Sequence, residues 1–386
     1  MFVLRHRRWP LLMGFTVVFT VLFLYASSDP GVSAFRERLE GLAYDFRLRY
    51  FLPDSPEKDP RIVIVDIDDK SLQQAGRWPW PRARLAQLIE QTGAMAPAVI
   101  GLDMVLAEPE LSPLEQLLDV LPDGSLEGMV STELLQLDER LAGDRQLARV
   151  LEENTVVLGY TLASSREASG GRLPEPIYRL SAQQRQSLDL PRMGGYLANI
   201  DSLQARVSGA GFFLVRPDDD GVIRRADLLL EYDGNLYPSL SLAIMHQYFG
   251  EPPLELLTAQ TGDRTILEGV DLSGALNLPT DEQGRVRIPF AGPRGSFRYL
   301  SAVDLMDGLV DPELLRDAIV LIGTTAQGLH DLRATPVGAV YPGVEVHANL
   351  LLGMLEGSFP VASDWAARGG DFLMLAAVGA LLALWM

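Results

Sequence analysis

The sequence predicts an α/β fold with a mainly parallel central sheet, an antiparallel extension and flanking helices, plus N- and C-terminal transmembrane helices. Three observations lead to this class. Continuous β-branched runs such as Arg61–Ile67 are typical of strands buried on both faces of a parallel sheet. Glycine- and aspartate-rich turns in the second half are typical of antiparallel strands. Two apolar runs, Leu11–Ala26 and Phe372–Met386, bracket the chain.

The first apolar run is predicted to be an uncleaved membrane anchor. Leu11–Ala26 has 16 uncharged residues, close to the about 20 that a bilayer core requires. Arg5, Arg7 and Arg8 precede it, so the positive-inside rule places the N-terminus in the cytoplasm and the bulk of the chain outside. A cleaved signal peptide also fits a basic start followed by an apolar core. Both interpretations export the residues that follow.

The second apolar run is predicted to begin another membrane helix. Phe372–Met386 has 15 residues, and at ~1.5 Å per residue it is too short to cross the bilayer. We therefore expect the chain to be the front part of a longer protein; the alternative is a core helix that ends the protein. The expected organisation is a cytoplasmic N-terminus over 1–10, a transmembrane helix over 11–26, an extracytoplasmic domain over 27–366 and the start of a second transmembrane helix over 367–386.

The composition argues against several kinds of function. The formal net charge is −18, which disfavours binding to nucleic acid or to anionic lipid. The chain has no cysteine, which excludes disulfides, thiolate metal sites and a cysteine nucleophile. It has 4 histidines, too few to favour a His-rich zinc site. We expect no cofactor and no nucleic-acid partner.

A helix is predicted between the first apolar run and the domain. Apolar residues recur at three- and four-residue spacing over Phe35–Tyr50, with charged residues between them. Pro53, Pro56 and Pro60 then end the pattern. This helix would be either a lever that passes motion to the membrane or a stalk packed on the domain.

The domain is predicted to open with a βαβ unit. Arg61–Ile67 and Val99–Asp103 have the pattern of buried strands, and Pro79–Gln91 that of the helix between them. The segments expected next are an irregular insertion over 109–145, a helix over 141–152, a strand over 155–160 and an irregular excursion over 164–195.

The second half of the domain indicates antiparallel strands. Gly211–Val215 and Val222–Tyr232 are predicted to flank a hairpin turn at Pro217–Gly221, and Arg285–Pro289 to add another strand. Ser301 is expected to cap a short helix. The remaining predictions are helices over 238–249 and 343–355 and a buried strand over 318–323.

Carboxylates at the ends of two predicted strands form the candidate ligand site. They are Asp66, Asp68, Asp69 and Asp103. Ligands usually bind at the carboxyl ends of parallel strands, so these groups could bind a small ligand or coordinate Mg²⁺ or Ca²⁺; whether any metal binds is left open. In the structural alternative, Asp69 or Ser71 caps the next helix and the others bond loop amides or pair with Arg82 and Arg84.

Two tryptophans beside this site are candidate binding residues. Trp78 and Trp80 alternate with prolines, and Arg82 follows them. Their rings could stack on a ligand or a partner. The structural alternative, which we favour, is that they close the top of the core and that Pro81 begins the next helix.

The run Asp218-Asp219-Asp220-Gly221 superficially resembles a calcium-binding loop. It lacks the twelve-residue ligand spacing and the terminal glutamate of such loops. A hairpin turn accounts better for the run.

Acid–base residues also occur near the last predicted helix. His330 and Asp331 are kept as candidate ligand-binding residues. Glu345 and His347 are two apart on a helix start, so they face different directions and do not chelate one ion. The preceding segment has neither a Gly-x-Ser-x-Gly elbow nor a Gly-Lys-Ser/Thr ending. We therefore predict no catalytic site and give these residues a sensory or architectural role.

Several segments together resemble the CHASE2 family and occur in that family's order. They are Tyr44–Arg47, Val63–Leu72, Gly76–Arg82, Ile100–Asp103, Asp218–Arg225, Ile319–Ala326, His330–Pro336 and Pro342–Asn349. They cover about residues 35–357. No single segment is decisive, but the ordered set is specific.

The resemblance implies an extracytoplasmic sensor domain of a bacterial transmembrane receptor, located in the inner membrane with its main domain periplasmic. Further membrane helices and a cytoplasmic output module would follow: an adenylate cyclase, a histidine kinase, a diguanylate cyclase or a Ser/Thr kinase. It also implies a homodimer that responds to an unknown small-molecule or protein stimulus. The competing interpretation is a freestanding, membrane-anchored exported binding protein or hydrolase.

Overall fold

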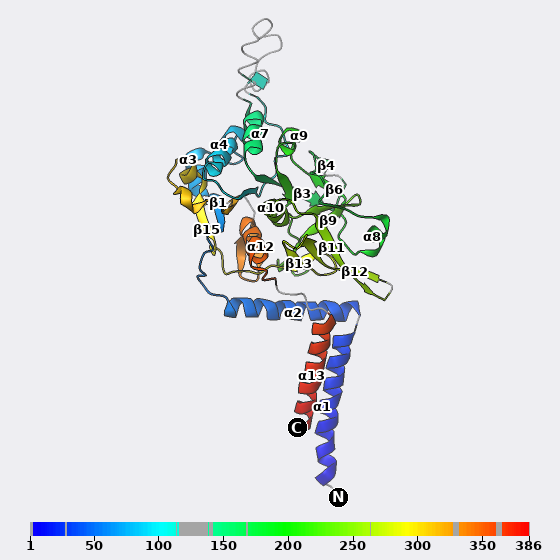
Figure 1. Cartoon of the computed structure of the whole chain (residues 1–386). Coiled ribbons are helices and arrows are strands. Elements are labelled where there is room, and N and C mark those ends of the chain that lie inside the picture. The colour runs from blue at the N-terminus through cyan, green and yellow to red at the C-terminus, as the bar shows by residue number, and fades with distance from the viewer. Residues whose placement is uncertain are drawn as a thin grey trace. The chain divides into compact units, whose positions relative to one another are not determined.

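The chain forms two units, shown in Figure 1. The first comprises Met1–Phe51 and Val361–Met386, and the second comprises Leu52–Pro360. The computed structural model describes residues 3–27, 29–112, 114–115, 138, 142–166, 169–262, 264–326, 332–359 and 365–385.

The second unit is built on a mainly parallel central sheet, as the sequence predicts. Its strands, in spatial order, are β15 (Arg298–Ser301), β1 (Ile62–Ile67), β16 (Ile319–Thr324), β2 (Val99–Leu102), β3 (Val156–Ala163) and β7 (Gly209–Phe212). All five of these neighbouring pairs are parallel. At the β3 end, β6 (Gly195–Leu197) adds an antiparallel strand, followed by β4 (Ser169–Gly170).

Helices cover both faces of this sheet, which explains the unbroken apolar runs in its strands. One face holds α3 (Asp69–Ala75), α4 (Arg82–Gly93), α7 (Gly143–Glu153) and α11 (Ala302–Met306); the other holds α10 (Leu240–Tyr248) and α12 (Gly343–Glu356). On the first face, Leu88 and Leu147 pack in one cluster with Val63 and Val65.

Two strand glycines allow α10 and α12 to lie close to the second face. A Cβ at Gly101 would lie 2.4 Å from the Cδ1 of Ile244 in α10. A Cβ at Gly323 would lie 2.8 Å from the Cβ of Val344 in α12. Since real Cβ atoms do not approach other atoms so closely, the helices occupy the space that these glycines leave empty.

Small antiparallel sheets form the predicted extension. Two of them have three strands, in the spatial orders β5 (Tyr178–Arg179), β10 (Asn235–Pro238), β9 (Leu229–Tyr232) and β11 (Leu254–Thr261), β12 (Arg264–Leu272), β13 (Asn277–Pro279). The other two are strand pairs: β8 (Arg225–Asp227) with β14 (Arg285–Arg287), and β17 (Leu332–Thr335) with β18 (Gly338–Pro342). Short helices α8 (Ala182–Ser187), α9 (Asp201–Gln204) and η1 (Pro312–Leu314) complete the unit.

The predicted hairpin of Gly211–Val215 with Val222–Tyr232 is wrong. The turn itself is present, since the Gly221 amide donates to the Asp218 carbonyl at 2.8 Å. However, β7 pairs in parallel with β3, whereas β8 pairs with β14. Gly211 permits this arrangement: a Cβ there would lie 2.5 Å from the Ser239 carbonyl oxygen, so the missing side chain lets the start of α10 cross the strand closely.

The first unit consists of α1 (Val3–Ala26), α2 (Pro30–Phe51) and α13 (Trp365–Trp385). The helix predicted over Phe35–Tyr50 is confirmed and begins earlier, at Pro30. Helices α1 and α13 pack against each other: the rings of Tyr25 and Phe372 lie 6.4 Å apart, and a Cβ at Gly379 would meet Val18.

The membrane prediction concerns the apolar helices of this unit. Among the described residues, no single helix has both the length and the apolarity expected of a membrane span. Met13–Ala26 and Gly31–Phe51 meet that criterion only together, as a pair bent by 97°. Phe372–Leu382 is a shorter apolar helix.

Candidate functional site

The candidate site lies where the carboxyl ends of β1, β16 and β2 come together. After β1 the chain enters α3 on one face of the sheet, whereas after β16 it continues to α12 on the other face. Such a change of direction between neighbouring parallel strands is where open α/β sheets usually bind ligands.

Asp66 is the next-to-last residue of β1 and points toward the α12 face. It pairs in register with Gly323 of β16, whose missing side chain leaves room for Val344. Its carboxylate accepts hydrogen bonds from the Thr325 backbone N–H at 2.9 Å and from the Thr325 hydroxyl at 2.5 Å. The side chain is buried, and burial raises the pKa of Asp66 from 3.8 to about 6, although the bonds from Thr325 oppose the rise.

Asp103 lies on the same face, on the other side of Gly323. It follows Leu102, which pairs with Ile322, so the alternation of side chains puts Asp103 beside Gly323. Burial raises its pKa to about 7, and the charge of Arg333 partly offsets this. The predicted convergence of strand-end carboxylates therefore holds for Asp66 and Asp103.

The first turns of α12 supply further polar groups, among them Glu345 and His347, for which the sequence predicts a sensory or architectural role and no partners. Glu345 is fully buried and accepts hydrogen bonds from the backbone N–H groups of Gly295 at 2.8 Å and Ser296 at 2.9 Å. The Tyr299 hydroxyl of β15 also donates to it, at 3.1 Å. Burial raises the pKa of Glu345, and these donors oppose the rise.

His347 and Asn349 fasten the same helix to other elements. Nδ1 of His347 lies 3.0 Å from the Ser241 hydroxyl of α10. Asn349 donates to the Tyr341 hydroxyl at 2.8 Å and accepts from the Ala291 N–H at 2.8 Å. The prediction that Glu345 and His347 face different directions is confirmed, because they bind different elements.

A serine, a histidine and an aspartate meet here, but not as a hydrolytic centre. Nε2 of His347 lies 3.9 Å from Oδ1 of Asp103, and its other nitrogen faces Ser241. Ser241 has 0% of its surface exposed. Since a nucleophile must reach its substrate, the arrangement is a buried polar network that fixes α12 to α10 and to the sheet.

Asp68, at the same edge of the sheet, has a structural role. It is the N-cap of α3 and accepts from the Ser71 N–H at 2.7 Å and from the Ser301 hydroxyl at 2.9 Å. The expectation that Asp69 or Ser71 caps this helix is therefore wrong. Ser301 precedes α11 as predicted, yet its own hydroxyl does not cap that helix; the Ser71 hydroxyl accepts from the Val303 N–H at 3.2 Å.

Trp78, Trp80 and Arg82 lie on the α4 side of the sheet, away from Asp66 and Asp103. The Trp80 ring is buried in the core cluster, and its N–H donates to the Gly76 carbonyl at 2.9 Å. Trp78 packs against it, with ring centroids 6.1 Å apart.

The structural alternative let the other aspartates bond loop amides or pair with Arg82 and Arg84; Asp66 accepts from the Thr325 N–H, whereas the two arginines contact other groups. Arg82 pairs with Asp144 at 3.2 Å, and its backbone N–H donates to the Glu110 carboxylate. Arg84 lies over the Trp80 ring at 6.0 Å. Asp69 is exposed at the start of α3.

Two predicted site residues, His330 and Asp331, lie outside the described residues. Within the part of the chain that the structure describes, no group of three or more histidines and carboxylates is placed to hold a metal ion.

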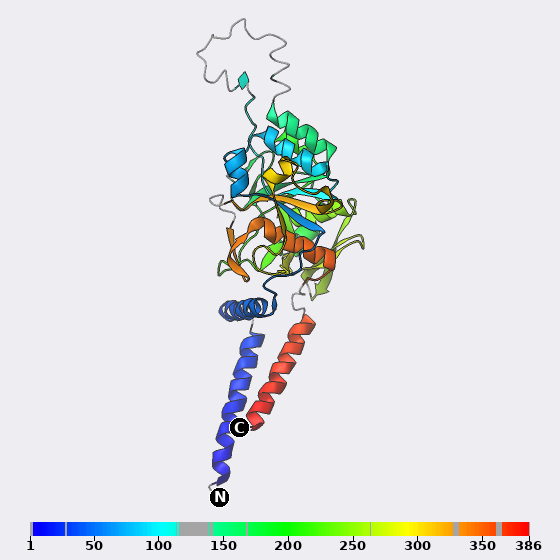
Figure 2. The same ribbon diagram turned by 90° about the vertical axis from the view of Figure 1, so that its left-hand side faces the viewer.

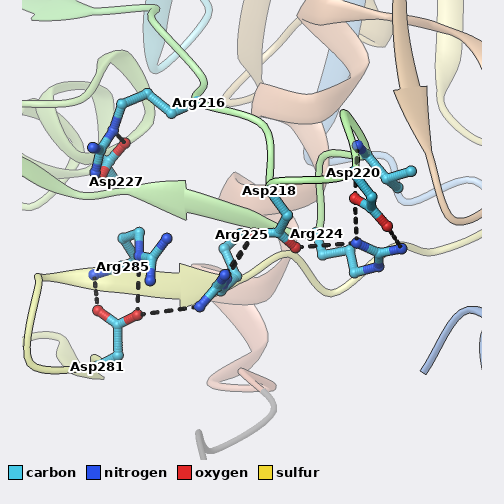
Figure 3. A network of polar contacts seen from close by, with 9 residues as sticks. Arg216, Asp218, Asp220, Arg224, Arg225, Asp227, Asp281 and Arg285 are labelled. Atoms are coloured by element: carbon cyan, nitrogen blue, oxygen red, sulfur yellow. Dashed lines mark hydrogen bonds and ion pairs between the residues drawn. The ribbon is translucent and has the colours of Figure 1, made fainter. Parts of the chain in front are cut away.

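The aspartate-rich turn is neutralised by arginines, as Figure 3 shows. Arg224 pairs with Asp220 at 2.8 Å and with Asp218 at 3.2 Å, and Arg225 pairs with Asp218 at 2.7 Å. Asp281 joins this network through Arg225, at 3.9 Å, and also pairs with Arg285 at 3.0 Å. The carboxylates of Asp218 and Asp220 thus serve ion pairs within the protein, in keeping with the interpretation as a turn rather than a calcium loop.

The family model of the CHASE2 domain matches residues 15–385, nearly the whole chain. No curated protein and no solved structure matches the sequence.

Proposed function

The chain belongs to the CHASE2 domain family, an extracellular sensor-domain family of signalling receptors, and we propose from this that it is the sensor region of a bacterial transmembrane receptor. The unit Leu52–Pro360 is then the extracytoplasmic sensor, and the unit that holds α1 and α13 is its membrane part. The family match over residues 15–385 is the observation that carries this proposal.

The packing of α1 against α13 supports membrane anchoring. Their half-buried residues form one stripe on each helix: Gly14, Val18, Leu22 and Tyr25 on α1, and Phe372, Ala376, Gly379 and Ala380 on α13. Small residues in such stripes let helices approach closely in lipid. The other apolar side chains face outward, with Phe19 71% and Leu373 69% exposed.

The polar network at the start of α12 is the part of the sensor that we assign to stimulus detection. A ligand or a protein that changes the charge or contacts of Asp66 or Asp103 would alter the bonds that hold this helix. Helix α12 ends at Glu356, and α13 begins at Trp365. A shift of α12 would therefore reach the membrane within a few residues of chain and, through a homodimer, a cytoplasmic cyclase or kinase.

Cysteine labelling tests the proposed placement. The chain has no cysteine, so each introduced cysteine is the sole reactive thiol. A membrane-impermeant maleimide should label Glu255→Cys, an exposed position on β11, in intact spheroplasts. It should label Arg5→Cys only after lysis. Labelling of Glu255→Cys only after lysis would contradict the proposal.

A further inference from the structure

We propose that α2 lies in the plane of the membrane surface, with one face sunk into the boundary between the lipid headgroups and the acyl chains. This inference rests on the proposed function, because it requires α1 to be in the bilayer. It differs from the lever and stalk interpretations, which make this helix a connector rather than a lipid-binding element.

The surface concerned is an apolar stripe on α2. Its residues are Phe35 (63% exposed), Leu39 (50%), Leu42 (62%), Phe46 (66%) and Tyr50 (72%). They recur at spacings of three and four residues, so they share one side of the helix. Tyr44 and Leu48, on the other side, are not exposed. The stripe is thus the large apolar face that this helix leaves uncovered.

Arginines border the stripe on both sides. At about 3.6 residues per turn, Arg38 and Arg49 fall along one edge and Arg36 and Arg47 along the other. From these edges the exposed Arg38 and Arg47 can lay their stems along apolar surface while their guanidinium groups reach lipid phosphates. Over Pro30–Phe51 the four arginines exceed the three acidic residues by one, whereas the whole chain carries −18. The local charge therefore suits an anionic headgroup layer, although the protein as a whole does not.

The bend between α1 and α2 is fixed by side chains at both helix ends. The Arg36 guanidinium donates to the Tyr25 carbonyl at 2.6 Å and lies 5.8 Å from the Tyr25 ring, so it satisfies a carbonyl at the end of α1. Asp29 accepts from the N–H groups of Gly31 at 2.9 Å and Val32 at 3.2 Å, which caps α2. With the axes bent by 97°, a membrane-crossing α1 directs α2 along the bilayer surface, as Figure 1 illustrates for this unit.

Lipid accounts for these features better than a second copy of the chain. A dimer interface would bury the arginine rows together with the stripe, opposing like charges at its border. A lipid boundary instead pairs the exposed Arg38 and Arg47 with phosphates and accepts aromatic rings such as those of Phe35, Phe46 and Tyr50.

Spin labels report the environment of each side of α2 directly. We consider four single-cysteine variants of the full chain, reconstituted in vesicles of phosphatidylethanolamine and phosphatidylglycerol. Leu42→Cys and Phe46→Cys probe the stripe, Glu40→Cys probes the polar side, and Val17→Cys probes α1. The readout is the accessibility of each label to apolar oxygen relative to a polar nickel complex.

The expected result is that the labels at 42 and 46 favour oxygen over the nickel complex, while the label at 40 favours the nickel complex. The label at 17 should be the deepest. If the labels at 42 and 46 favour the nickel complex, as the label at 40 does, while the label at 17 remains in lipid, the inference fails and the proposed function stands. If the label at 17 also lies in water, the proposed function fails as well. Shielding of 42 and 46 from both reagents would mean a protein contact and would overturn the assignment to lipid.

Discussion

Replacing Asp66 by asparagine should remove a pH-dependent loss of stability. The carboxyl group is buried at the end of β1, and its pKa is raised from 3.8 to about 6. Between these two values the folded chain binds more protons than the unfolded chain, so the stabilising contribution is complete below pH 4 and declines as the pH rises through about 6.

The size of the effect follows from the two pKa values. At about 1.4 kcal/mol for each pH unit, a rise from 3.8 to about 6 corresponds to roughly 3 kcal/mol lost between pH 4 and pH 7. Asparagine stays neutral and can still accept from the Thr325 N–H. We therefore expect Asp66→Asn to unfold at the same temperature as the unsubstituted chain, or at a lower one, at pH 4. At pH 7.5 we expect it to unfold several degrees above the unsubstituted chain.

Thermal unfolding of the detergent-solubilised chain, measured from pH 4 to pH 8, checks this expectation. Asp69→Asn is the matched control, because it removes an exposed aspartate three residues away. Its difference from the parent should be small and nearly constant with pH. The reasoning is refuted if the unfolding temperature of Asp66→Asn falls with rising pH as steeply as that of Asp69→Asn.

Two further changes test how α12 is held. Glu345→Ala leaves the N–H groups that bind this carboxylate without an acceptor, and it should lower the free energy of unfolding, measured by denaturant titration, by about 3 kcal/mol. The control is Glu356→Ala, at an exposed position of the same helix, which should change the free energy of unfolding by less than about 0.5 kcal/mol. Gly323→Ala puts a Cβ 2.8 Å from Val344 and should cost about 1–3 kcal/mol. Val344→Gly removes the Cβ and Cγ atoms that the new Cβ would meet; the double variant should therefore lose less than the sum of the two single changes, and strict additivity would count against a direct contact.

The sequence predicts the sheet well because its strands are locally unambiguous. Ile62–Ile67 is β-branched at five of six positions, and its full burial leaves no competing assignment. Asp66 and Asp103 could likewise be selected from the sequence, because both lie at the carboxyl ends of predicted parallel strands, where ligands usually bind. What the rule does not show is which side of the sheet each residue faces, and Trp80 and Arg82 arrive with the crossover helix on the opposite side.

Long-range contacts account for most of what was missed. Glu345 binds residues 46 to 50 positions earlier in the chain, and no local pattern names such partners. The sequence does contain an indication of these contacts. Polar residues alternate with apolar ones at the start of α12, and polar side chains on a buried helix need hydrogen-bond partners. The sequence analysis also does not predict the paired strands β11 and β12, although apolar and polar residues alternate in parts of both strands on either side of a turn at Gly262.

Disulfide formation between α1 and α13 tests the central claim, that these two helices hold the sensor in the membrane as a pair. A Cβ at Gly379 would lie 3.4 Å from the Cβ of Val18, close to the range of about 3.5–4.5 Å that a disulfide spans. In isolated membranes, mild oxidation should join Val18→Cys to Gly379→Cys within one chain, whereas Val17→Cys, which faces outward, should not crosslink to Gly379→Cys. Absence of the bond in the first variant, or loss of α1 from the mature protein, would contradict the account.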